Sequence, residues 1–142
     1  MANDKNGPAG HKPAPRILLA DDVEDAADSL ATCLQAHGCE VFVAWAGDEA
    51  VSLAEKHKPD ILILDVEMPG LNGYEVARYV RAQPWGSKPV LIAHTGLSEA
   101  SDRQDGKDAG FDHYLSKPFN LEELTALILD CGYSFDAVDP TR

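Results

Sequence analysis

The stretch Ile61–Asp65, with the sequence ILILD, is the most informative part of this chain. Four apolar residues in a row, after Lys58-Pro59-Asp60, predict a strand buried on both faces, as in a parallel sheet covered by helices on both sides. The strand ends at an acid, and open α/β sheets bind their ligands just beyond the carboxyl ends of their strands. Asp65 therefore occupies a position where chemistry is common, although a lone Asp there is more often only the cap of a loop or helix.

Length and composition indicate a single soluble domain. With 142 residues the chain is long enough for one domain with a substantial core. Its formal net charge of -12, from 24 acids against 12 Lys and Arg, works against non-specific binding to nucleic acids and to anionic membrane surfaces. No apolar run approaches the roughly 20 residues of a membrane span, and residues 1–15 lack the apolar region of a signal peptide. We therefore expect a cytoplasmic protein that binds neither nucleic acid nor membrane.

The cysteines do not form a recognisable binding or disulfide pattern. They are odd in number and lack C-x-x-C spacing: Cys33, Cys39 and Cys131. We expect them to be reduced, small core residues rather than metal ligands or parts of a disulfide framework.

Short apolar runs alternate along the chain with segments of helical periodicity. The expected strands are residues 16–20, 41–44, 61–65, 89–93 and 111–115. The expected helices are residues 24–37, a segment around 50–57, a segment from near Asn72 to before Pro84, residues 98–109, and a last helix that starts at Asn120 with Glu123 as its capping-box partner. This alternation predicts an α/β domain with a parallel sheet, right-handed crossovers and helices on both faces. We expect the domain to cover residues 16–131, between a disordered tail at 1–15 and a short tail at 132–142.

Polar groups follow several of the expected strands: Asp21-Asp22, Asp65, Thr95 and Lys117. Because the carboxyl ends of parallel strands lie at one edge of a sheet, we expect these side chains to converge. Clustered carboxylates repel one another unless a cation joins them, and carboxylate, carbonyl and water oxygens suit Mg²⁺. A metal ion, a lysine ammonium and a threonine hydroxyl around one carboxylate can stabilise a transferring phosphoryl group. Asp65 would then be the nucleophile that forms an aspartyl phosphate.

Four motifs, in this order, resemble those of the receiver domain of two-component response regulators. They are Asp21-Asp22, Asp65–Gly73 (DVEMPGLNG), Thr95-Gly96 and Ala109–Phe119 (AGFDHYLSKPF). The resemblance covers nearly all of the chain between the two expected tails. It implies a flavodoxin-like doubly wound (βα)5 sandwich whose five-stranded parallel sheet has the order 2-1-3-4-5.

The resemblance also implies a role for each matching position of the site. Asp65 matches the phosphoacceptor, and Lys117 matches the lysine that pairs with the phosphoryl oxygens. Asp22, Asp65 and the backbone carbonyl of Glu67 match the direct ligands of Mg²⁺, while Asp21 matches the acid that acts through metal-bound water. Glu67 also occupies a variable position that tunes the lifetime of the phosphoryl group in this family, and the sequence leaves that lifetime open.

Thr95 and Tyr114 match a pair of switch residues. The hydroxyl of Thr95 is expected to move toward the phosphoryl group, after which the ring of Tyr114 turns inward. Tyr114 equally fits a half-buried strand residue with its hydroxyl in water, so the sequence leaves both interpretations open. The expected helix at 98–109 is polar and contains Gly106, so little burial holds it to the sheet, and we expect it to move during switching.

The resemblance implies partners on both sides of the reaction. The donor would be a phosphohistidine on a sensor histidine kinase or a histidine phosphotransfer protein. We expect a single-domain, chemotaxis-regulator-like protein whose downstream target binds the face of helix 98–109, strand 111–115 and the last helix. Its only catalysis would be its own phosphoryl transfer and autodephosphorylation. Similarity of Ala109–Asp112 to receivers of hybrid sensor kinases leaves a phosphorelay role open.

Two other α/β proteins are competing interpretations. A phosphatase of the haloacid-dehalogenase type also uses an aspartate nucleophile and Mg²⁺. It needs Asp-x-Asp on its first strand, whereas here the motif begins at the end of the third strand and has Glu67 at its second acidic position. A flavodoxin-like electron carrier needs a Ser/Thr-rich phosphate loop after its first strand, which this sequence lacks. His94, next to Thr95, is interpreted as a strand-end histidine rather than a neighbour of the phosphoryl group.

Overall fold

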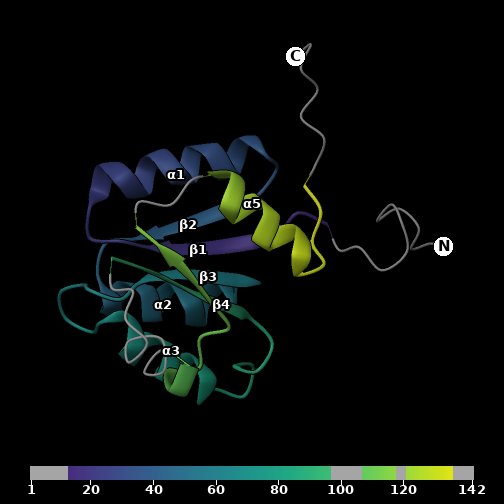
Figure 1. The fold of residues 1–142 in the computed structure, drawn as a ribbon. Helices are drawn as coiled ribbons and strands as arrows, with labels where there is room; N and C mark the ends of the chain where they lie inside the picture. Colours follow the sequence, from purple (N-terminus) through teal and green to yellow (C-terminus); the bar gives the residue numbers. More distant parts are fainter. Residues whose placement is uncertain (1–12, 97–106, 118–120, 136–142) are drawn as a thin grey trace, which may run out of the picture.

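The computed structural model describes residues 13–96, 107–117 and 121–135, which form alternating strands and helices (Figure 1). The elements are β1 (Arg16–Ala20), α1 (Glu24–Ala36), β2 (Glu40–Ala44), α2 (Gly47–His57), β3 (Ile61–Asp65), α3 (Gly73–Arg81), β4 (Val90–Thr95), β5 (His113–Ser116) and α5 (Leu121–Asp130). Most of the helix predicted at 98–109, and the cap predicted at Asn120, lie outside the described residues, although 107–109 are helical.

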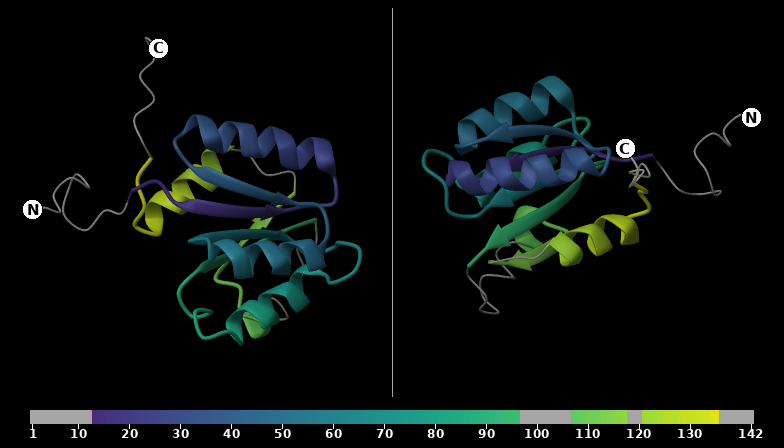
Figure 2. Two further views of the ribbon diagram at one scale, coloured as in Figure 1. Left: turned by 180° about the vertical axis from the view of Figure 1, so that it is seen from behind. Right: turned by 90° about the horizontal axis from the view of Figure 1, so that it is seen from above.

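The strands form one sheet in the order β2-β1-β3-β4-β5, and every pairing is parallel. Helices α1 and α5 cover one face of this sheet, and α2 and α3 cover the other (Figures 1 and 2). The predicted flavodoxin-like, doubly wound sandwich is therefore confirmed. In this order β3 is the central strand, so the ILILD stretch lies in the middle of the sheet.

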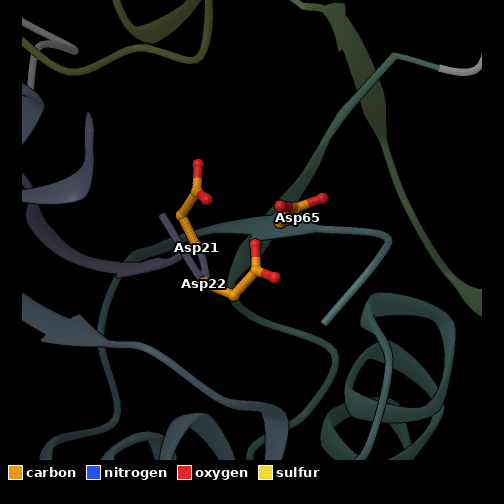
Figure 3. Close-up of side chains that lie close together, drawn as sticks. All are labelled: Asp21, Asp22 and Asp65. Carbon is orange, nitrogen blue, oxygen red and sulfur yellow. The ribbon is translucent and has the colours of Figure 1, made fainter. Parts of the chain in front are cut away.

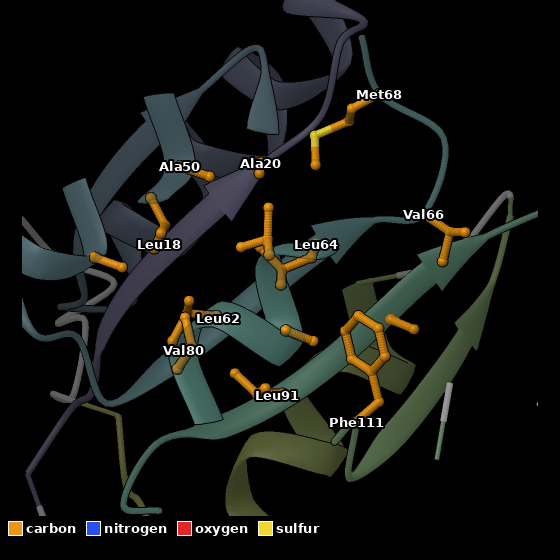
Figure 4. Packing of buried hydrophobic residues seen from close by; sticks show 14 of the residues in the cluster. Leu18, Ala20, Ala50, Leu62, Leu64, Val66, Met68, Val80, Leu91 and Phe111 are labelled. Atoms are coloured by element: carbon orange, nitrogen blue, oxygen red, sulfur yellow. The ribbon is translucent and has the colours of Figure 1, made fainter. Parts of the chain in front are cut away.

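The residues of β3 are all buried, as the apolar run predicts. Leu62 and Leu64 pack into the layer under α2 and α3 (Figure 4). Ile61 and Ile63 point to the opposite face, into the layer under α1 and α5. Burying one such side chain stabilises a fold by roughly 1.5–3 kcal/mol relative to leaving it exposed. The two layers together hold β3 in place, and with it the carboxyl end where Asp65 lies.

Some of the predicted boundaries differ from those in the structure. β5 begins at His113 rather than at 111, and Phe111, just before it, is a buried side chain of the layer under α2 and α3. Tyr133, expected in a tail, is buried in the layer under α1 and α5, so the packed domain extends beyond residue 131. Pro15, expected in the other tail, is buried as well.

The cysteine prediction is correct for only part of the set. Cys39 is buried and Cys131 is partly buried, but Cys33 is exposed. Cys33 precedes the buried Leu34 on α1, and adjacent positions of a helix point in different directions. The prediction of a core position is therefore wrong for Cys33.

Arg81, at the end of α3, ties three segments together through its guanidinium group. Its Nε and Nη2 donate to the carbonyl of Gly110, at 3.0 and 2.8 Å. Its Nη1 donates to the carbonyls of Gly86 and Pro89, at 2.8 and 2.9 Å. Nη2 also donates to Oδ2 of Asp112 at 2.8 Å. These contacts join the end of α3 to the starts of β4 and β5.

Replacing Arg81 by lysine is expected to lower the free energy of unfolding by about 3 kcal/mol, because one ammonium cannot satisfy carbonyls on three segments at once. Urea unfolding followed by circular dichroism would measure this loss. Arg78→Lys, at an exposed position of the same helix, is the matched control and should change stability by less than about 0.5 kcal/mol. An Arg81→Lys loss as small as that of the control would contradict the assigned role.

Candidate functional site

The three acids predicted to converge lie together at the carboxyl edge of the sheet (Figure 3). β1 and β3 are neighbours in which Ala20 pairs with Leu64, so the residues that follow them, Asp21 and Asp65, emerge side by side. One carboxylate oxygen from each of Asp21, Asp22 and Asp65 lies within 4.8 Å of the others. Asp21 and Asp65 are buried and Asp22 is exposed, so the cluster is open to solvent on one side.

Backbone N–H groups orient the two buried carboxylates. The N–H of Val23 donates to Oδ1 of Asp21 at 2.9 Å, and the N–H of Glu67 donates to Oδ1 of Asp65 at 3.0 Å. In both cases the acid accepts from the backbone two residues on, the contact of an Asx-turn. The side chain of Glu67 is exposed, so this residue contacts Asp65 through its backbone.

The loop that follows β3 leads directly into α3, whose first residues pack against the end of β3. Asn72 caps this helix by accepting the N–H of Glu75 at 2.9 Å, and the Glu75 carboxylate accepts the N–H of Asn72 at 2.9 Å. Gly73 donates its N–H to the carbonyl of Val66 at 3.0 Å. A Cβ at Gly73 would lie 2.5 Å from the carbonyl oxygen of Asp65, so only glycine lets the helix approach the end of β3 this closely.

Lys117 approaches Asp65 along the same edge, from the β4 and β5 flank of β3. At the ends of β4 and β5, Thr95 pairs with Ser116, and the N–H of Lys117 donates to the carbonyl of Thr95 at 2.8 Å. Nζ of Lys117 then lies 2.8 Å from Oδ2 of Asp65. The Asp65 side chain is 2% exposed and that of Lys117 is 32% exposed, so the contact is shielded on the acid's side and hydrated on the lysine's side.

Burial and the contact between Asp65 and Lys117 shift the pKa values of both groups. Burial raises the pKa of Asp65, while the hydrogen bonds from Lys117 and from the N–H of Glu67 oppose that rise. Burial also works to lower the pKa of Lys117, but its hydrogen bond with Asp65 and the charges of Asp65, Asp21 and Asp22 outweigh burial and raise that pKa. Lys117 is therefore an ammonium at neutral pH, held against the buried carboxylate.

His94 lies within the same group of side chains. It pairs with Asp65 across β3 and β4, and its Nδ1 is 3.9 Å from Oδ2 of Asp21. Burial lowers the pKa of His94 to about 4; repulsion from Lys117 acts in the same direction, and Asp21 opposes both. The imidazole is therefore neutral at neutral pH. The sequence favoured a strand-end histidine over a neighbour of the phosphoryl group. His94 does lie near the end of β4, and its ring is also close to Asp21.

Thr95 and Tyr114 lie on adjacent strands at this edge. Thr95 ends β4 and is 1% exposed. Ala93 pairs with Tyr114 and Thr95 pairs with Ser116, so Thr95 and Tyr114 are diagonal neighbours on one face of the sheet. Tyr114 is half-buried, with its ring edge-on to Phe111 at 6.4 Å between centroids. This position agrees with the half-buried interpretation, and the switch role of the pair stays a prediction.

Comparison with known proteins identifies the family. The family described as "Response regulator receiver domain" matches residues 17–129. The chain belongs to this family. Response regulator MprA of Mycobacterium leprae is 42% identical over 113 residues, which are 80% of this chain and 49% of MprA. The chain thus spans about half the length of the curated relatives it matches.

Solved structures agree with the receiver fold. Chemotaxis response regulator CheY4 of Vibrio cholerae matches with a TM-score of 0.77 and 32% identity, over 81% of this chain and 96% of CheY4. The receiver domain of sensor histidine kinase PA1611 from Pseudomonas aeruginosa matches with a TM-score of 0.75 and 32% identity, over 82% of this chain and 96% of that domain. That structure holds a magnesium ion in its active site cleft. Within residues 13–96, 107–117 and 121–135, no helix has the length and apolar character of a membrane span.

The donor atoms of this receiver domain suit a hard divalent cation. Three carboxylates within 4.8 Å, beside one ammonium, leave a net negative charge that such a cation would neutralise. Mg²⁺ prefers oxygen ligands and usually keeps several waters, for which the exposed side of Asp22 leaves access. Because the group found here consists of carboxylates alone, it suits Mg²⁺ better than the softer transition metals.

Proposed function

We propose that this receiver domain accepts a phosphoryl group on Asp65 from a phosphohistidine of a sensor histidine kinase or a histidine phosphotransfer protein. The observation that carries the proposal is the 2.8 Å contact of Lys117 Nζ with Asp65 Oδ2, beside two further carboxylates. It combines one acceptor carboxylate, one cation at hydrogen-bond distance and a cluster of oxygen donors. Membership of the response regulator receiver family supports the same reaction.

In the proposed reaction, a carboxylate oxygen of Asp65 attacks the phosphorus of the phosphohistidine. A new O–P bond forms while the N–P bond breaks, and the imidazole of the donor leaves with the electron pair of that bond. The transferring group carries negative charge over its oxygens, and the Lys117 ammonium pairs with one of them. Asp21, Asp22 and Asp65, with the backbone carbonyl of Glu67, would hold Mg²⁺, and the ion would supply further positive charge beside the transferring group.

We propose a single phosphoryl transfer to the chain itself, rather than turnover of an external substrate. Incubation with acetyl phosphate and Mg²⁺ should add one phosphoryl group per chain, measured by intact-mass spectrometry. A phosphatase of the haloacid-dehalogenase type would instead release many equivalents of phosphate from an ester such as p-nitrophenyl phosphate. Sustained release of that kind, without a phosphorylated chain, would show that the proposed function is wrong.

We propose that the output surface includes β5 and α5. A cavity of about 350 Å³ lies between these two elements, and Tyr114 and Leu127 are among the residues that line it. Leu129, on α5, is 51% exposed and offers apolar surface to a partner protein. Movement of the Tyr114 ring, after Thr95 turns toward the phosphoryl group, would change the shape of this cavity. That coupling links Asp65 to a downstream partner.

A further inference from the structure

A second candidate surface lies at the opposite edge of the sheet from Asp65. Two adjoining cavities open there, of about 580 and about 750 Å³, and they share Lys88 and Pro89. Their lining includes Asp60, Pro89 and Asp112, the residues that immediately precede β3, β4 and β5. Both volumes are in the range of ligand-binding clefts.

Basic side chains gather at this edge, although the chain as a whole has a net charge of -12. Four of them line the two cavities: Lys58, Arg81, Lys88 and Lys107. The carboxylate of Asp60 accepts the N–H of Arg16 at 2.9 Å, and that of Asp112 accepts from Arg81 at 2.8 Å. Both acids thus accept from donors of the chain itself, and Asp112 is exposed, as are the three lysines. The basic groups that line the two cavities outnumber these two acids. The edge therefore offers lysine charge to an acidic ligand.

Lys58 is held in a defined position beside an aromatic ring. Among the described residues other than glycine, it alone has a positive φ, with φ 46° and ψ 63° at the end of α2. Its N–H donates to the carbonyl of Ala54 at 2.8 Å, and its Nζ donates to the carbonyl of Glu55 at 3.0 Å. That Nζ lies 5.8 Å from the ring centroid of Trp85, within the range of a cation–π contact. This left-handed conformation is that of a helix C-cap, and it fixes the point at which the Lys58 side chain leaves α2.

Apolar surface lies next to these charges. Trp85 is partly buried and lines the first cavity together with Pro59 and Tyr133. Phe111 lines the second cavity. A ligand for this edge should therefore combine negative groups with an apolar or aromatic side chain, which is the composition of an acidic peptide segment.

We propose that this lysine-lined edge, defined by Lys58, Trp85, Lys88 and Lys107, binds an acidic peptide segment of a partner protein. Carboxylates of the segment pair with the lysines, and one of its apolar side chains packs on Trp85. A nucleic acid fits less well, because its continuous row of phosphates would extend past the three lysines over a chain of net charge -12, whereas a short acidic segment can stay beside them. The Arg81 guanidinium is bonded to carbonyls and to Asp112, which leaves the lysines as the ammonium donors.

The test uses the full chain without phosphoryl donor, titrated with a short peptide in which Asp and Glu flank one phenylalanine. Binding is followed by ¹⁵N chemical shifts, and by Trp85 fluorescence in a Trp45→Phe background. The double variant Lys58→Glu/Lys88→Glu should weaken binding by about tenfold or more. Lys56→Glu, an exposed lysine outside the residues that line these cavities, should leave it within about twofold.

Two further arms test whether binding requires the acidic groups of the peptide and whether it is independent of Asp65. The same peptide with Asn and Gln in place of the acids should bind at least about tenfold more weakly, and Asp65→Asn should bind the acidic peptide as the parent does. Equal binding of the neutral peptide, shifts centred away from Lys58 and Lys88, or no saturable shift would overturn the proposal. Tighter binding of a single-stranded oligonucleotide than of the peptide would overturn it as well. None of these outcomes depends on phosphoryl transfer to Asp65.

Discussion

The Asp65→Asn variant is expected to take up no phosphoryl group from acetyl phosphate and Mg²⁺, whereas the parent chain should gain one by intact mass. An amide has no anionic oxygen with which to attack phosphorus. The nearby acids cannot replace it, because Asp65 alone has an oxygen at 2.8 Å from Lys117 Nζ among the described acids. Asp21 and Asp22 therefore lack the close lysine contact that would stabilise a group transferred to them.

The same variant should keep its fold, so the loss can be assigned to chemistry. The amide oxygen of Asn can accept the N–H of Glu67 as Oδ1 of Asp65 does at 3.0 Å. Lys117, at 32% exposure, stays partly hydrated when its partner loses its charge. Asp28→Asn, at an exposed position of α1, is the matched control and should be labelled like the parent. Labelling of Asp65→Asn at the parent's level would remove Asp65 as the acceptor.

The parts of this protein that follow local patterns could be predicted from its sequence. The run of apolar residues at 61–64 has no polar position, so it must be covered on both faces, and the structure covers it with two layers of helices. The proximity of Asp21 and Asp65 could be predicted from the sequence, because residues at the carboxyl ends of parallel strands share one edge of the sheet. The capping box of Asn72 and Glu75 was also present in the sequence as Asn-x-x-Glu.

Contacts between distant segments could not be predicted in this way. Arg81 bonds Gly110 and Asp112, about 30 residues away, and no periodicity links an arginine on one helix to a carbonyl before a later strand. The burial of Tyr133 likewise depends on where α1 and α5 pack. His94 is next to Asp21 because β1 and β4 both flank β3, a relation that appears only when the strand order is known.

Magnesium is expected to stabilise the parent chain but not the Asp22→Ala variant. A ligand that binds only the folded state raises the free energy of unfolding by about 2.7 kcal/mol at one hundred times its dissociation constant. Asp21, Asp22 and Asp65 place their oxygens within 4.8 Å, so removing the exposed member takes away one of the carboxylates that would hold the ion. Thermal unfolding in EDTA and in excess MgCl₂ would show a shift for the parent and almost none for the variant.

The melting temperatures of the metal-free proteins provide a second check on the role of Asp22. Three clustered carboxylates repel one another, so Asp22→Ala in EDTA should melt at or above the temperature of the parent in EDTA. Glu67→Gln is the matched control: it removes an exposed carboxylate but keeps the backbone carbonyl, so its magnesium shift should equal that of the parent. A full magnesium shift in Asp22→Ala would show that Asp22 is not a ligand. If Glu67→Gln instead lost the magnesium-dependent rise in melting temperature, the ion would be bound by the Glu67 side chain. The two variants distinguish these cases because Asp22→Ala removes a carboxylate of the cluster and Glu67→Gln removes one outside it.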